Sequence, residues 1–336
     1  MHAAVLHTPG EPPVFGDHPD PVPTAGQSLV QVAAAPLVPL DLLCASGTSY
    51  FGRPVVPYVP GVQGVGTVVR SGVLAAGTRV WFATSAGMAP GDGSLAELCV
   101  VPDEDLVPLE SPVPDATIAA LGLSAVAAWM SLTWRARLQP GESVLVLGGG
   151  GAVGQAAIGA ARVLGAGRVV AVCRSVEAQE RARLAGAHEV VAMTSDVDEL
   201  TARLAGAAGG AADVVIDPVF GVAATAASRI LADGGRLVNV GGASGDEATF
   251  SSAVLRGRSA SVLGYTNNSL TADQRREALS AVVEHAGTGH LVVAHETWPL
   301  RDVAEVWQRQ STGQAQLRLV LLASGEVTST REEAAR

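Results

Sequence analysis

Hydrophobic positions in the middle of the chain follow strand and helix periods in turn. Four apolar residues, Val144–Leu147, end in glycines, and a run of helical composition and spacing follows them. A second apolar run comes where the next strand of a βαβ unit belongs. The alternation then continues, which predicts a parallel sheet with helices on both faces. The predicted strands are 143–147, 168–173, 188–192, 213–216 and 235–240, and the predicted helices are 152–164, 176–185, 196–205 and 221–231.

A different pattern covers residues 1 to about 117. This part is rich in proline, glycine and valine, and turn signals separate its short strand-like runs, as in a small β-barrel. The runs are 28–32, 64–69, 78–82 and 95–101. From Pro114 the residue pattern changes. Residues 115–137 predict a helix that is interrupted near Gly122.

The end of the chain combines both patterns. Residues 259–264 read as the last strand of the parallel sheet, at its edge. Two helices, 272–285 and 300–310, and a final strand, 316–322, follow. The closing residues, 329–336, are charged, and we expect them to be frayed.

A glycine-rich turn joins the first parallel strand to its helix. The pattern Gly149-x-Gly151-x-x-Gly154 suits a backbone that approaches a pyrophosphate closely, and the helix N-terminus offers free N–H groups. We therefore predict dinucleotide binding, with Ala152 and Val153 among the contacts. The alternative is a glycine-rich loop that only packs a helix against a sheet.

On its motifs, the chain resembles the medium-chain dehydrogenase/reductase superfamily, and within it the zinc-free quinone oxidoreductase branch, which includes enoyl reductases. The motifs include PYVPGVQGVGTVV (57–69), LQPGESVLVLGGGGAVGQAAIGAARVLGA (138–166) and LADGGRLVNVGGASG (231–245). The resemblance implies an α/β fold in which a Rossmann doubly wound parallel sheet is inserted into a GroES-like β-barrel domain. The implied domains are 1–117 with 265–336 for the barrel, and 118–264 for dinucleotide binding.

The resemblance also locates three positions where zinc members of the superfamily carry their ligands. Here those positions hold Val38, Val62 and Leu121, and aliphatic side chains do not bind zinc. The three cysteines, Cys44, Cys99 and Cys173, are scattered and cannot supply a four-cysteine lobe. We expect no metal.

Residues at the end of the second parallel strand contact the adenosine ribose of the cofactor. The strand runs into Arg174-Ser175, with no carboxylate before Glu177. An arginine fork and a hydroxyl suit a 2′-phosphate, so we expect NADPH. In the family a lysine often stands where this chain has Ala178, and Arg181 is a possible second cation. The alternative is that Arg174 is a solvated loop residue.

The remaining site residues are implied by the resemblance. Tyr50 either donates a proton to the substrate or only shapes the pocket wall, which would also include Phe51 and Tyr265. Ser124 would bond the nicotinamide carboxamide, and Asp41 and Asp217 would brace their loops. Val38 departs from the asparagine common in relatives. Residues expected to line the cofactor further along the chain are Gly241, Gly242 and Ser244.

Composition and net charge exclude some kinds of binding partner. The 336 residues are 48% hydrophobic with a net charge of −10, which argues against nucleic acid or an anionic membrane surface as partner. All 22 basic residues are arginines, which excludes lysine chemistry. Neither a signal peptide nor an apolar run near membrane-span length is evident, and the cysteine usage fits the cytoplasm. By resemblance, we expect a homodimer.

The leading hypothesis is a zinc-independent, NADPH-dependent oxidoreductase. Its substrate would be a small molecule with a conjugated carbonyl, a quinone or an enone or enoyl compound, with natural-product tailoring as one setting. Two alternatives stay open: a non-enzymatic NADPH-binding sensor or structural protein, and a metal-free alcohol dehydrogenase.

Overall fold

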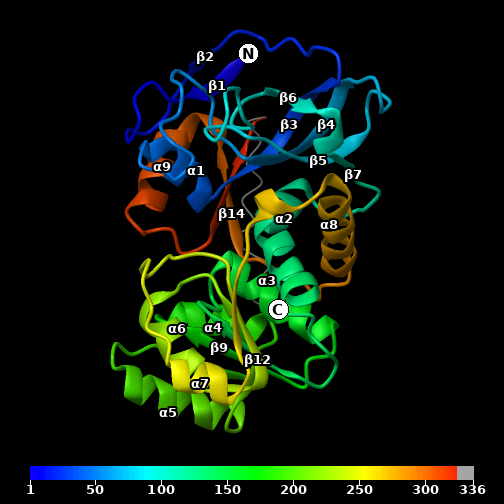
Figure 1. The fold of residues 1–336 in the computed structure, drawn as a ribbon. Coiled ribbons are helices and arrows are strands. Elements are labelled where there is room, and N and C mark those ends of the chain that lie inside the picture. The colour runs from blue at the N-terminus through cyan, green and yellow to red at the C-terminus, as the bar shows by residue number, and fades with distance from the viewer. Residues whose placement is uncertain (324–336) are drawn as a thin grey trace. The chain divides into compact units, whose positions relative to one another are not determined.

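The computed structural model describes residues 1–323 and divides the chain into two compact units (Figure 1). The first unit combines Met1–Gly122 with the chain from Ala294 onward, and the second is Leu123–Val293. The sequence analysis assigned residues 265–293 to the first domain, whereas the structure groups them with the second unit. Helix α8 lies in this stretch and packs on α2, where the rings of His285 and Trp129 stack at 5.5 Å. The predicted frayed end, 329–336, lies outside the described residues.

The second unit is built on a six-stranded parallel sheet with the order β10-β9-β8-β11-β12-β13. Counted from β8, this is the order 3-2-1-4-5-6 of the Rossmann fold, as expected. The strands β8 and β9 have the predicted bounds, and β13 lies at a sheet edge. The bounds are β8 Ser143–Leu147, β9 Arg168–Cys173, β10 Glu189–Ala192, β11 Ala212–Asp217, β12 Leu231–Asn239 and β13 Ser261–Gly264.

Helices cover both faces of this sheet. Alternate strand residues such as Leu145 and Val170 pack in one apolar core with α5 and α6. Helices α3 and α4 pack against β8, β9 and β10 and against each other. Side chains cap the helix starts, as where Asp196 accepts the backbone N–H groups of Asp198 and Glu199. The bounds are α3 Ala152–Val163, α4 Val176–Leu184, α5 Val197–Ala208, α6 Gly221–Ser228, α7 Ser252–Gly257 and α8 Ala272–Gly287.

Helix α2, Asp115–Met130, is kinked as the sequence predicts. Gly122 has φ 30° and ψ −133°, outside the helical region, and a five-residue π-helical turn, Ser131–Arg135, follows α2. Contrary to the expectation from the sequence, one segment, Asp115–Arg135, is apolar and long enough to cross a membrane, but 72% of its most apolar window is buried inside the protein. That burial is typical of a core helix.

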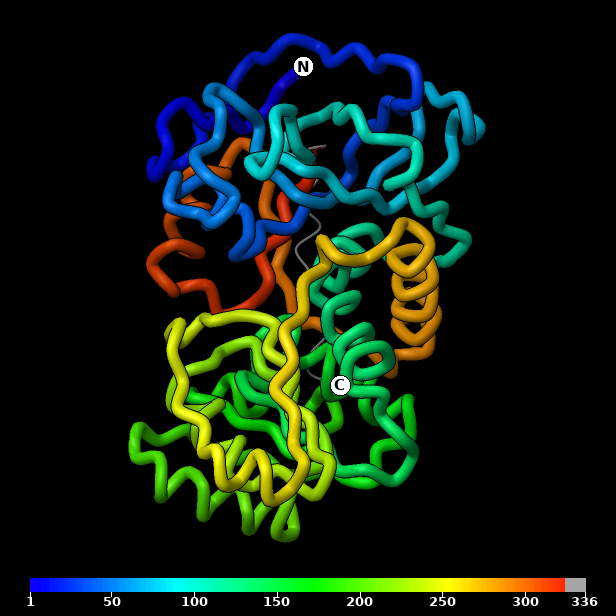
Figure 2. The backbone as a smooth tube through the Cα atoms, viewed as in Figure 1, coloured from blue at the N-terminus to red at the C-terminus, as the bar shows by residue number. Residues whose placement is uncertain are grey.

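The first unit contains a seven-stranded sheet with pairing order β14-β15-β3-β4-β5-β7, and β6 also pairs with β3. In residues 1–323, no pairing between β14 and β7 closes the sheet into the barrel that we expected. Figure 2 shows the late strand β15 beside the early strand β3, with which it pairs antiparallel. The first unit is therefore built from both parts of the chain, as expected for the first domain.

Short elements complete the first unit. A separate two-stranded sheet joins β1 and β2 near the N-terminus. The predicted runs match β4–β6 and β15 to within about three residues and cover only the first part of β3. The strands β1, β2, β7 and β14 and the helix α1 were not predicted. The bounds are β1 His2–Val5, β2 Val14–Asp17, β3 Gln27–Leu37, α1 Pro39–Ser46, β4 Gln63–Arg70, β5 Arg79–Ala83, β6 Leu98–Pro102, β7 Leu106–Pro108, β14 His295–Pro299, α9 Val303–Ser311 and β15 Arg318–Leu322, with 3₁₀ turns at Asp103–Asp105, Asn267–Ser269 and Leu300–Asp302.

Candidate functional site

The glycine turn lies in the second unit, between β8 and α3. A Cβ atom on Gly149 would lie 2.6 Å from the Cβ of Ala171, and one on Gly154 would lie 2.3 Å from the carbonyl oxygen of Gly148. Side chains therefore do not fit at these two positions, because strand and helix pack directly against the turn. Gly149, Gly150 and Gly154 are buried, whereas Gly151 is exposed, so the turn reaches solvent at Gly151, where α3 begins.

Backbone N–H groups at this turn divide into two sets. Those of Gly149 and Gly151 are used within the fold, by the carbonyl oxygens of Val172 and Gly148, each at 3.0 Å. Those of Ala152 and Val153 open α3 and make no hydrogen bond within residues 1–323. Unused N–H groups at a helix start, beside the exposed Gly151, fit the pyrophosphate of a dinucleotide.

Two side chains donate hydrogen bonds to the carbonyl of Gly150, within the glycine turn. The Gly150 oxygen accepts a hydrogen bond from Gln155 Nε2 and another from Arg181 Nε, each at 3.0 Å. Gln155 is 4% exposed on α3, and Arg181 is half-buried on α4. A Cβ atom on Gly150 would lie 2.5 Å from the Cβ of Ala178, so α4 also packs directly against the turn.

Arg174 and Ser175 follow β9 at the same edge of the sheet. Arg174 is exposed and has no hydrogen-bond or ion-pair partner in residues 1–323. Ser175 caps α4, because its oxygen accepts the N–H of Ala178 at 3.1 Å. Glu177 is fully exposed, and its own backbone N–H, followed by the Ser175 hydroxyl, lowers the pKa of its carboxyl. Since the serine already bonds its own helix, Arg174 is the group free to meet an anion here.

Two further loops lie at the carboxyl ends of β11 and β12. Asp217 is buried and accepts the N–H groups of Val219 and Phe220 at 3.0 and 2.7 Å, so it braces its loop as predicted. Burial raises the pKa of this carboxyl. The Ser244 N–H donates to the Val219 carbonyl at 2.7 Å, and Val219 lies against Gly148.

The structure therefore brings most of the predicted cofactor residues together at the carboxyl ends of the parallel strands. The glycine turn, the Arg174-Ser175 turn and the loop with Gly241, Gly242 and Ser244 all follow strands β8, β9 and β12 at their carboxyl ends. In open parallel sheets, ligands bind at this end, where the strand order reverses between β8 and β11.

Ser124 and Tyr265 belong to the same unit. Ser124 is 9% exposed on α2. The Tyr265 hydroxyl donates to Asn267 Oδ1 at 2.7 Å, and the Asn267 amide donates to the Leu123 carbonyl. The Tyr265 ring also meets Trp134 edge-on at 6.3 Å, and burial raises the pKa of its phenol. Because its hydroxyl donates inside the fold, Tyr265 is not a free proton donor.

Tyr50 and Phe51 belong to the first unit, in the turn after α1. Their rings tilt against each other at 4.2 Å, and Tyr50 is 77% exposed. The Tyr50 hydroxyl makes no hydrogen bond in the described part of the chain. It is therefore free to donate a proton, which Tyr265 is not.

The three positions that correspond to zinc ligands converge within the first unit. Asp41 accepts the N–H groups of Val38 and Val62, at 2.8 and 2.9 Å. Gln63, beside Val62, lies against Gly122, which follows Leu121. Val38, Val62 and Leu121 are all buried, and in residues 1–323 no group of three His, Cys, Asp or Glu side chains is placed to hold a metal ion.

Asp41 acts as a structural carboxylate at this point. It is 1% exposed, and it also caps α1 by accepting the N–H of Val38. Burial raises its pKa to about 6, against the opposing effect of its backbone donors and the charge of Arg318. The sequence analysis predicted this bracing role.

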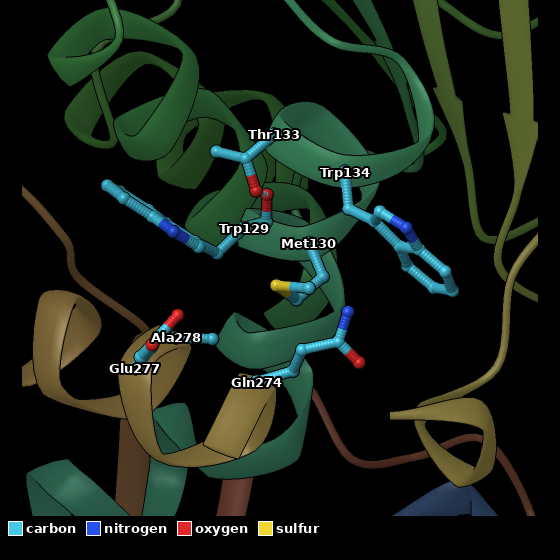
Figure 3. Close-up of a pocket in the computed structure, with 7 residues that line it drawn as sticks. All are labelled: Trp129, Met130, Thr133, Trp134, Gln274, Glu277 and Ala278. Carbon is cyan, nitrogen blue, oxygen red and sulfur yellow. Dashed lines mark hydrogen bonds between the residues drawn. The ribbon is translucent and has the colours of Figure 1, made fainter. Parts of the chain in front are cut away.

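A separate hollow of about 290 Å³ lies between α2 and α8 in the second unit (Figure 3). It contains none of the predicted site residues. Trp129 and Trp134 extend away from each other on either side of Met130, and the Gln274 and Glu277 side chains come from α8. The lining residues are Trp129, Met130, Thr133, Trp134, Gln274, Glu277 and Ala278.

Sequence reasoning missed Gln155 as part of the site. Its signal was available, because it is the one polar side chain early in the apolar helix that follows the glycine turn. Arg181 was noted only as a second cation, and its bond to the turn depends on how α4 packs.

Comparison with known proteins places the chain in a family. A family model described as "Zinc-binding dehydrogenase" matches residues 152–284, and one described as "Alcohol dehydrogenase GroES-like domain" matches residues 24–111. The bovine quinone oxidoreductase-like protein 2 is 32% identical over 83% of this chain and 81% of its own length. This chain belongs to the quinone oxidoreductase branch of the medium-chain dehydrogenase/reductase superfamily. It is thus an oxidoreductase of the quinone oxidoreductase type.

Solved structures of the superfamily share its fold. The quinone oxidoreductase of Thermus thermophilus, described with its NADPH complex, has a TM-score of 0.79 and 28% identity over 96% of this chain and all of that one. A protein described as an NAD-dependent alcohol dehydrogenase has a TM-score of 0.81 and 28% identity over 96% of this chain and 99% of that one. These two relatives of equal identity differ in the nicotinamide cofactor that their descriptions name.

Proposed function

We propose that this quinone oxidoreductase family member is a zinc-independent, NADPH-dependent reductase of a conjugated carbonyl compound. The substrate is a quinone, or an enone or enoyl compound. One observation supports the proposal: two anion-binding groups follow neighbouring strands. The closely packed glycine turn leaves the N–H groups of Ala152 and Val153 unused, and Arg174 at the end of the next strand is exposed and has no partner in the described chain.

The preference for NADPH rests on charge at the end of β9. A guanidinium without a protein partner suits a 2′-phosphate, and no carboxylate stands there to accept the 2′-hydroxyl of NADH. Glu177 is the first acidic residue after the strand, and it is fully exposed. The NADPH complex of the Thermus relative supports this choice, and the NAD-dependent relative makes the measurement necessary.

The other proposed cofactor contacts lie at the carboxyl ends of the same strands, and Ser124 lies on α2. Ala152 and Val153 bind the pyrophosphate through their N–H groups, while Gly241, Gly242 and Ser244 line the cofactor further along and Ser124 bonds the carboxamide. When bound, NADPH supplies a hydride.

Zinc independence rests on residue identity. Val38, Val62 and Leu121 have no donor atom in their side chains, and the one nearby carboxylate, Asp41, bonds two backbone N–H groups. A conjugated acceptor spreads the negative charge of reduction onto its oxygen, so it needs a Lewis acid less than a simple ketone does. The residues therefore favour a conjugated acceptor.

We also propose Tyr50, Phe51 and Tyr265 as the aromatic side chains that contact the substrate. A flat acceptor suits aromatic side chains. The proton that completes the reduction comes from water or from the Tyr50 hydroxyl, since Tyr265 donates to Asn267. We also propose a homodimer, through the edge strand β13.

Oxidation of NADPH with a panel of quinones and enones tests the function, with zinc content measured on the same preparation. We expect turnover with at least one conjugated acceptor, no turnover with simple alcohols, and no stoichiometric zinc. NADPH binding without turnover of any acceptor would favour a sensor or structural protein instead. Oxidation of simple alcohols alone would favour a metal-free alcohol dehydrogenase, and one zinc per chain would contradict zinc independence.

A further inference from the structure

We propose that Arg181 is a positioning residue for the pyrophosphate of the dinucleotide, acting through the carbonyl of Gly150. The inference rests on the proposed function, because it concerns the same nucleotide site. It differs from the role considered in the sequence analysis, in which Arg181 is a second cation for the 2′-phosphate.

The contacts at the Gly150 oxygen carry the argument. A carbonyl oxygen has two lone pairs, and Gln155 and Arg181 each donate to it at 3.0 Å. The two donors come from different helices, α3 and α4. Together they hold the oxygen, and with it the plane of the 150–151 peptide, in one orientation.

The orientation of this peptide matters because the next residues, Ala152 and Val153, offer their N–H groups to an anion. If the Gly150 peptide turned, its oxygen would bring partial negative charge to that helix start and would oppose a phosphate. Glycine gives this backbone the freedom to turn. The Gly151 N–H holds the other side of this peptide, because it donates to the Gly148 carbonyl at 3.0 Å. The two side-chain donors fix the oxygen from outside the turn, so that the peptide keeps one conformation.

The packing of α4 keeps Arg181 in place. Ala178 approaches Gly150 so closely that a Cβ atom on the glycine would lie 2.5 Å from the alanine Cβ. Ala178 and Arg181 are three residues apart and so lie on one face of the helix. Helix α4 thus presents a methyl group and a guanidinium to the same turn.

Arg174 and Arg181 should then act on different parts of the cofactor. Arg174 is exposed and unpartnered in residues 1–323, which suits the 2′-phosphate, whereas Arg181 is bonded to the pyrophosphate turn. Loss of Arg181 should weaken NADPH and NADH alike, because both carry the pyrophosphate. Loss of Arg174 should weaken NADPH alone.

Isothermal titration with two cofactor fragments separates these roles. ADP has the pyrophosphate but no 2′-phosphate, and adenosine 2′-monophosphate has the 2′-phosphate but no pyrophosphate. We expect Arg181→Ala to raise the Kd for ADP about tenfold, about 1.4 kcal/mol, and to change that for adenosine 2′-monophosphate less than about twofold. Arg174→Ala should give the opposite pattern.

Arg183→Ala is the matched control. Arg183 is on the same helix, is exposed, and pairs with Glu180 at 3.3 Å. This variant removes the same charge from α4 without touching the turn, so ADP binding should stay as in the native protein. Arg181→Lys, which keeps a donor, should recover part of the ADP affinity, and Arg181→Met should not. Melting temperatures identify any variant that fails to fold.

The outcomes are distinguishable. If the native protein binds ADP and Arg181→Ala binds it equally well, or loses only adenosine 2′-monophosphate, the positioning role is wrong while the proposed function stands. If the native protein binds neither fragment nor NADPH, the proposed function fails and this inference fails with it.

Discussion

Arg174 is the side chain on which cofactor choice depends in our proposal. It is exposed at the end of β9 and has no partner within residues 1–323, so its full charge is available to a 2′-phosphate. We expect the native protein to bind NADPH at least tenfold more tightly than NADH, about 1.4 kcal/mol or more. Arg174→Ala should remove most of this preference in a fluorescence titration. Equal affinity of the native protein for both cofactors would contradict the assignment.

Tyr50 is the one predicted pocket phenol that is free to donate. Removing a general acid typically lowers turnover by roughly 10²-fold or more. We expect the smaller effect for Tyr50→Phe, mainly in KM, because Tyr50 is 77% exposed and water can protonate a delocalised enolate. Steady-state kinetics with the best acceptor from the panel measures this, and Tyr265→Phe serves as comparison. A hundredfold loss in kcat at unchanged KM would instead make Tyr50 the proton donor.

At the scale of elements, Asp41 joins the start of α1 to the start of β4. Burial raises its pKa from 3.8 to about 6. Between these values the folded state holds the proton more tightly than the unfolded state, so Asp41 contributes less stability as the pH rises through this window. Its ionised form is the costly one, because the carboxylate is out of water.

Asp41→Asn tests this pH dependence. We expect the native protein to lose stability relative to the variant as the pH rises from about 4 to 7, by on the order of 2 kcal/mol. Denaturant unfolding of both proteins across this pH range gives the difference in their free energies of unfolding. The other titrating groups contribute equally to both proteins, so their effects cancel in this difference. Parallel stability curves would show that the Asp41 pKa is not raised.

The kink of α2 depends on Gly122. Its φ of 30° disfavours any side chain, and a Cβ atom would lie 2.0 Å from Gln63 Oε1. Gln63 cannot easily move, since it is 1% exposed and accepts the indole N–H of Trp81 at 3.2 Å. We therefore expect Gly122→Ala to destabilise the protein by roughly 3 kcal/mol or more.

Thermal and denaturant unfolding check this expectation. The control is Gly206→Ala, on α5, where a Cβ atom would meet nothing within 4 Å. That variant should be neutral or slightly stabilising, because alanine restricts the unfolded chain and favours helix. A Gly122→Ala protein as stable as the control would show that the helix can straighten there without cost.

At the scale of the whole molecule, the parallel sheet has an edge at β13. In residues 1–323 this strand pairs only with β12, and Val262 on it is 37% exposed. An unpaired edge invites a second copy, and pairing across a two-fold axis would cover two edges at once. We expect light scattering to show a dimer that Val262→Asp weakens. Val292→Asp, a comparably exposed valine outside the strand, should not weaken it, and a stable native monomer would contradict the dimer.

Local patterns located all six strands of the second unit but missed α7 and began β12 four residues late, and they located a smaller share of the strands of the first unit. The bounds of β8 and β9 follow from apolar runs that end in glycine or polar residues, because a buried parallel strand is apolar throughout. The strands β1, β2, β7 and β14 have only three to five residues each, so a period is hard to see in them. The equally short β5 and β6 were located because turn signals separate their apolar runs.

The sequence by itself determined the Rossmann alternation, the glycine turn after the first parallel strand, the arginine that follows β9 and the aliphatic residues at the zinc-ligand positions. Each of these depends on residue identity or on a short-range period. Only the tertiary structure decided that Arg181 reaches the carbonyl of Gly150, 31 residues away, and that β15 pairs with β3. It also decided that α8 belongs to the second unit. Such contacts join residues far apart in the chain, and the packing of several elements selects them.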